Sequence, residues 1–145
     1  MRGIFSYLAM TAILLTADAR AQDTLIQPPE PFLVLQSGPG TVVAGPLDID
    51  DIEISESGGR TDLFIRLAPE ATARLREVTA PPSPTPLGAT ICGRPVPIVE
   101  TPLPVTSGTV YIADRTAQEG EAMRALWSGR IRCAALSPEV FSNAQ

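Results

Sequence analysis

The sequence contains no histidine and no lysine, and it has only 2 cysteines among its 145 residues. Without an imidazole, the Ser-His-Asp and Cys-His arrangements that activate a nucleophile are excluded. Zinc sites that use histidine are excluded too, and two cysteines are too few for a four-cysteine zinc site. We therefore expect a protein that is not an enzyme, with no catalytic, cofactor-binding or metal-ligating residue.

Positive charge is also scarce. The 11 basic residues are all arginines and face 16 acidic residues, which leaves a net charge of −5. Phosphate backbones and anionic lipid surfaces are both bound through lysine and arginine, so an acidic chain matches neither. We expect no nucleic-acid partner and no binding to an anionic membrane surface.

Residues 1–21 have the pattern of a cleavable signal peptide. Arg2 supplies the positive start, and an uncharged apolar run follows over residues 4–15. A membrane-spanning helix needs roughly 20 residues, so an uncleaved anchor is the weaker alternative. Small residues allow cleavage after Ala19 or Ala21, and we favour Ala21 because polar residues follow it. The expected product is exported, most simply to the periplasm, and is not stably inserted in the membrane.

The chain beyond the signal peptide predicts one domain with short strands and two helices. Residues 22–31 are polar and rich in proline, which predicts an extended lead-in. Alternating or β-branched apolar runs between turn residues predict strands. These runs cover residues 32–36, 41–43, 52–55, 62–67, 89–92, 95–99 and 108–113.

Two helices complete the predicted domain over residues 32–132. One covers residues 69–79, and the other follows a capping box formed by Thr116 and Glu119. Neighbouring strands with short connections predict a mostly antiparallel sheet with both helices packed on one face, an α+β fold. Residues 133–145 are small and polar without a period, and predict a C-terminal tail.

The acidic cluster Asp48, Asp50, Asp51 and Glu53 is the one candidate for a cation site. Its spacing does not fit a calcium-binding EF-hand loop, because Ile52 occupies the fifth position counted from Asp48. We interpret the cluster as a solvated surface.

Cys92 and Cys133 are candidates for one disulfide. An even number of cysteines in an exported chain favours this pairing. Closing such a loop would stabilise the fold by roughly 4 kcal/mol on the chain-entropy model. Two free buried thiols are the alternative, and a redox-active pair is disfavoured because there is no CxxC motif.

Arg94 is a candidate contact for a partner. The apolar runs on either side of Gly93-Arg94 predict a β-hairpin with a type II′ turn, which would place Arg94 at an exposed tip. A guanidinium there could donate to carboxylates or carbonyls. The alternative is a turn residue whose charge only keeps the tip solvated.

Several segments of the chain follow one another in an order and spacing that match a known family. They are residues 33–35, 41–45, 47–55 and 63–67, the helix around Ala71, Leu75 and Thr79, and residues 87–97, 108–113 and 126–129. Together they resemble the head subdomain of the first periplasmic domain of SecD and SecDF, the membrane proteins that assist protein export. The resemblance covers roughly residues 33–130, and the family's hairpin usually has an acid where this chain has Cys92.

The resemblance implies a SecD-like head fold that contacts polypeptide or an envelope protein, in connection with export. The sequence given ends at residue 145 before any membrane-spanning helix, so we expect a stand-alone head without the family's proton-driven motor. A stand-alone structural envelope domain is one alternative, and a carboxylate-dependent envelope hydrolase is a less favoured one. The oligomeric state is left open.

We predict that the signal peptide is cleaved after Ala21. N-terminal sequencing of the protein from an envelope fraction should therefore begin at Gln22, because Ala19-Arg20-Ala21 offers small residues at both recognition positions. Ala21→Leu should slow processing at this site. A protein from the envelope that begins at Met1 would contradict the prediction.

Overall fold

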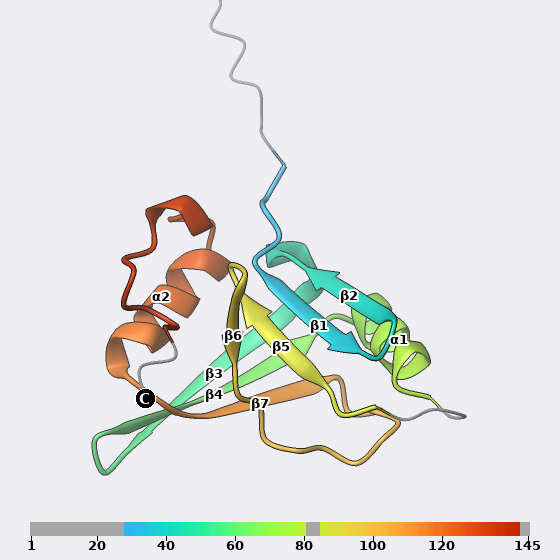
Figure 1. Ribbon diagram of the computed structural model, residues 1–145. Coiled ribbons are helices and arrows are strands. Elements are labelled where there is room, and N and C mark those ends of the chain that lie inside the picture. Colours follow the sequence, from blue (N-terminus) through green and yellow to red (C-terminus); the bar gives the residue numbers. More distant parts are fainter. Residues whose placement is uncertain (1–27, 81–84, 143–145) are drawn as a thin grey trace, which may run out of the picture.

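The computed structural model describes residues 28–80 and 85–142, and Figure 1 shows how their elements are arranged. The predicted signal peptide and most of the lead-in lie outside the described residues. Within them the chain forms two α-helices and two antiparallel sheets, which confirms the predicted α+β class.

The first sheet has four strands in the order β2-β1-β5-β6. Neighbouring strands in it are all antiparallel. In Figure 1 this sheet lies in front of the second one. Its strands are β1 (Leu33–Ser37), β2 (Gly40–Ala44), β5 (Gly88–Ile91) and β6 (Arg94–Val96).

The second sheet has three antiparallel strands in the order β3-β4-β7. The sequence predicted one sheet, whereas the strands divide between two. The physical reason lies after β2, where Pro46 opens a short 3-10 helix, η1 (Pro46–Asp48), that carries the chain away from the edge of the first sheet. The strands of the second sheet are β3 (Ile49–Ser57), β4 (Arg60–Leu67) and β7 (Thr109–Arg115).

The hydrophobic core lies between the inner faces of the two sheets and the helices. In β4 the predicted alternation is confirmed, since Leu63, Ile65 and Leu67 are buried while Arg66 is exposed. The helix α1 (Pro69–Val78) contributes Ala71 and Leu75 to the same core. Burial of these apolar side chains is the main term that holds the sheets together.

The second helix, α2 (Ala117–Trp127), begins with the predicted capping box. The Thr116 hydroxyl accepts from the Glu119 amide, and the Glu119 carboxylate accepts from the Thr116 amide at 2.8 Å. Gly120 lowers the helix propensity, but it is buried against the second sheet. A Cβ there would lie 3.2 Å from Thr61 Cγ2 and 3.4 Å from Ile54 Cγ2, so glycine lets the helix approach the sheet closely.

The predicted C-terminal tail is part of the core. Leu136, Val140 and Phe141 are buried, and Phe141 keeps only 1% of its surface exposed. The boundary at Cys133 is therefore not the end of the packed domain. Because this segment contains only η2 (Cys133–Ala135) and turns, its buried residues follow no helical or strand period that the sequence could reveal.

Gly108→Ala should lower the free energy of unfolding by about 2–4 kcal/mol. Gly108 has a φ of +67°, and an added Cβ would collide with the Thr72 hydroxyl and lie 2.9 Å from Thr72 Cγ2. Gly59→Ala is the matched control, because Gly59 has a φ of +79° and no described atom within 4 Å of the added Cβ. The control should lower the free energy of unfolding by only about 1–2 kcal/mol, since an alanine there is strained by its positive φ but collides with no other residue. Urea denaturation measures both, and equal losses would contradict the predicted collision.

Candidate functional site

The three candidate residues of the sequence meet at one corner of the domain. Cys92 and Cys133 form the predicted disulfide, with their Cα atoms 5.3 Å apart across a sequence separation of 41 residues. The chain returns from the end of α2 because Gly129 has a φ of +70°, a conformation that reverses the direction after a helix. The disulfide thereby joins the β5–β6 hairpin to the start of the C-terminal segment, which we define as residues 133–142.

The hairpin turn lies one residue earlier than predicted. Ile91 pairs with Arg94, so Cys92 and Gly93 are the two central residues of the turn. Both have positive φ, 51° and 75°, as a type I′ turn requires and a type II′ turn does not. The sequence favoured the later position because glycine, not cysteine, is the usual residue at positive φ.

Arg94 is therefore the first residue of β6 and is half-buried, not an exposed tip. Its guanidinium donates to the backbone carbonyl of Ser137 at 2.7 Å and also to that of Val140. The donor that was predicted to bind a partner's carbonyls binds carbonyls of the chain's own C-terminal segment. Contact between Arg94 and a partner stays a prediction, but the exposure on which it was based is corrected.

Glu119 is a second anchor for the C-terminal segment, which the sequence did not reveal. Its carboxylate is buried, and Oε1 accepts from the Phe141 amide at 3.0 Å while Oε2 accepts from Thr116. The Arg115 guanidinium lies 3.7 Å from Oε1. A buried carboxylate is stable only when its oxygens are paired, and the capping box alone pairs one of them.

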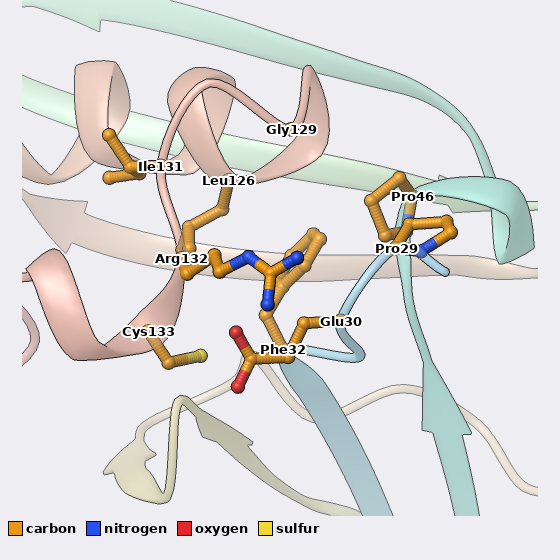
Figure 2. Close-up of a pocket in the computed structure, with 9 residues that line it drawn as sticks. All are labelled: Pro29, Glu30, Phe32, Pro46, Leu126, Gly129, Ile131, Arg132 and Cys133. Atoms are coloured by element: carbon orange, nitrogen blue, oxygen red, sulfur yellow. The ribbon is translucent and has the colours of Figure 1, made fainter. Parts of the chain in front are cut away.

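A pocket of about 190 Å³ lies beside the disulfide. Figure 2 shows its walls, which come from the chain before β1, from the start of η1 and from the end of α2 with the stretch after it. Its position depends on the return of the chain to Cys133. The lining residues are Pro29, Glu30, Phe32, Pro46, Leu126, Gly129, Ile131, Arg132 and Cys133.

The lining of this pocket mixes polar and apolar surface in nearly equal amounts, with apolar side chains behind two opposite charges at the mouth. Phe32 and Leu126 are each 3% exposed and belong to the core. In Figure 2 the Arg132 guanidinium and the Glu30 carboxylate extend over Phe32 from opposite walls. The guanidinium is a hydrogen-bond donor and the carboxylate an acceptor, so a ligand at the mouth could both accept and donate a hydrogen bond.

Two members of the acidic cluster form ion pairs on the surface. The Asp48 carboxylate lies 2.8 Å from the Arg74 guanidinium, and the Asp51 carboxylate lies 3.1 Å from that of Arg66. Within residues 28–80 and 85–142, no group of three or more histidine, cysteine or acidic side chains is arranged to hold a metal ion.

The outer face of the second sheet carries an aromatic pair. The rings of Phe64 and Tyr111 stack with their centroids 4.5 Å apart. The Tyr111 hydroxyl donates to Asp62 at 3.1 Å, and the Asp62 carboxylate also accepts from the Asp114 amide. Desolvation, followed by the hydrogen bond and the charge of Asp62, raises the pKa of Tyr111 above its usual value.

Comparison with known proteins gives no relative for this chain. No family model, no curated protein and no solved structure matches it. Among the helices of the described part of the chain, none is long and apolar enough to cross a membrane. The arrangement of the residues themselves is therefore the basis for a functional proposal.

Arg94→Ala should lower the free energy of unfolding by about 1–3 kcal/mol, because the backbone carbonyls of Ser137 and Val140 lose a charged donor. Arg76→Ala is the matched control, since Arg76 is exposed and its side chain forms no ion pair with a described residue. The control should stay within about 0.5 kcal/mol of the parent. Chemical denaturation compares the two variants. An unchanged free energy of unfolding for Arg94→Ala would show that the Arg94 hydrogen bonds do not stabilise the C-terminal segment.

Tyr111 should ionise above pH 10 in the folded protein, and Asp62→Asn should move its pKa back toward 10. Tyr7 lies in the predicted signal peptide, so tyrosinate absorbance of the processed chain reports Tyr111 alone. The raised pKa means that the fold favours the neutral phenol. Its contribution to stability is therefore complete below pH 10 and is lost as the pH rises through the folded pKa. A Tyr111 pKa at or below that of the urea-unfolded chain would refute this.

Proposed function

We propose that this chain is an exported, non-enzymatic domain, SecD-head-like in build, that binds polypeptide in the periplasm in connection with protein export. The observation that carries the proposal is the pocket beside the disulfide. It combines apolar side chains with one donor and one acceptor at its mouth. A polypeptide offers the complementary groups, namely apolar side chains with N–H and C=O groups beside them.

The disulfide supports the exported location. Disulfides persist in oxidising compartments and are uncommon in the cytosol. Cys92 and Cys133 are paired in the fold, and the described part of the chain has no free cysteine. This agrees with the signal-peptide pattern of residues 1–21.

The pocket is supported by a fixed backbone. The Phe32 amide donates to the Ala44 carbonyl at 3.1 Å, and its carbonyl accepts from the Cys92 amide at 2.7 Å. The floor is thus tied both to β2 and to the hairpin turn, while the disulfide fixes the opposite wall at Cys133. A preformed site loses little conformational entropy on binding, which favours affinity.

The processed chain should bind an unfolded polypeptide saturably and should not bind the same polypeptide when it is folded. A model polypeptide that has been reduced and blocked with iodoacetamide stays unfolded without gaining charge. Fluorescence anisotropy of the labelled polypeptide measures its binding to the oxidised protein, and the native form of the polypeptide is the control.

Absence of binding to the unfolded form would refute the proposal and would favour a stand-alone structural domain. Hydrolytic turnover of the polypeptide that an Asp or Glu substitution abolishes would favour the hydrolase alternative.

A further inference from the structure

The dimensions and the charges of the pocket specify what part of a polypeptide it accepts. We propose that it takes one leucine- or phenylalanine-sized side chain, while Arg132 donates to a carbonyl and Glu30 accepts from an N–H of the peptide groups beside it. This inference rests on the proposed function and names the segment that is recognised.

The volume of the pocket selects a single side chain. An engineered apolar cavity of about 150 Å³ holds one benzene molecule, and the pocket measures about 190 Å³. Pockets for drug-sized ligands run from roughly 300 to 1,000 Å³, well above this size. The pocket is therefore large enough for one aromatic or branched aliphatic side chain and too small for a larger organic molecule.

The lining of the pocket offers polar and apolar surface in nearly equal amounts, with slightly more polar surface, and its apolar part can receive an apolar side chain. Phe32 and Leu126 form the floor, and Pro46, Ile131 and the Cys133 sulfur complete the walls. A polar side chain would lose its hydration there without a buried partner. An alanine would fill little of the space and would leave much of the apolar lining uncovered.

The charges at the mouth favour a peptide group over a simple ion. Glu30 and Arg132 are both exposed, and within the described residues neither forms an ion pair. A small anion would meet the Glu30 carboxylate, and a small cation would meet the Arg132 guanidinium. A peptide segment is neutral and presents a donor and an acceptor together, so it complements both groups.

The test uses short peptides with acetylated and amidated ends that differ at one central position. Leucine and phenylalanine peptides should bind the oxidised, processed protein roughly 10- to 50-fold more tightly than the alanine peptide, from the apolar surface that they bury. Isothermal titration calorimetry measures each affinity. Free leucine, a zwitterion without peptide groups, should bind far more weakly than the leucine peptide.

Matched variants assign the binding to the pocket. Arg132→Ala and Glu30→Ala should each weaken binding of the leucine peptide by roughly 3- to 10-fold, the range of an ordinary hydrogen bond, because both groups are exposed to solvent. Arg130→Ala is the control, because Arg130 is exposed, lies two residues from Arg132 and does not line the pocket. Ile131→Trp should fill the pocket and remove the preference for leucine over alanine, with thermal melts confirming that each variant folds.

The outcomes separate this inference from the proposed function. If unfolded polypeptide binds but leucine and alanine peptides bind alike, or the pocket variants match Arg130→Ala, the inference fails and the function stands. If neither polypeptide nor peptide binds, both fail.

Two other results would identify a different occupant of the pocket. Binding of free leucine as tight as that of the leucine peptide would make this a small-molecule pocket. Self-association of the protein that is lost only in Arg132→Ala would make a second copy of the chain the occupant. Either result would overturn the inference.

Discussion

The attachment of the C-terminal segment to the β5–β6 hairpin is the constraint on which the rest of the structure depends. It consists of the Cys92–Cys133 disulfide and the Arg94 guanidinium on two carbonyls, and the Glu119 carboxylate of α2 holds the same segment through the Phe141 amide. Loop closure by the disulfide contributes roughly 4 kcal/mol on the chain-entropy model, against about 5–15 kcal/mol for the stability of a typical domain. Loss of the attachment would expose the apolar side chains that this segment places in the core, Phe141 above all.

The same attachment shapes the candidate site. The stretch from Gly129 to Cys133, which turns back from α2 at Gly129, is fixed to the hairpin at Cys133, and it forms one wall of the pocket. Phe32, on the other side, is tied to Cys92 through its carbonyl. One covalent link therefore connects the core, the hairpin and the pocket, so that the stability of the fold and the shape of the site are not independent.

The periodic parts of the fold were predictable from the sequence, whereas the contacts between distant segments were not. The alternation in β4 and the capping box at Thr116 depend on neighbours in the chain, and the structure confirms both. The C-terminal segment has no period, so its burial could not be seen. Arg94 was misplaced because a cysteine at positive φ shifted the turn by one residue. The pocket combines residues from three separate parts of the chain, and only the tertiary fold brings them together.

The central claim is that the pocket beside the disulfide receives a side chain of a bound polypeptide. The most direct measurement is a map of backbone amide chemical shifts in the oxidised, processed protein as a leucine-containing peptide is added. The expected result is a saturable set of shifts confined to the pocket lining, around Phe32 and from Leu126 to Cys133. Shifts that concentrate on the outer face of the second sheet, around Phe64 and Tyr111, and leave the pocket unchanged would contradict the claim.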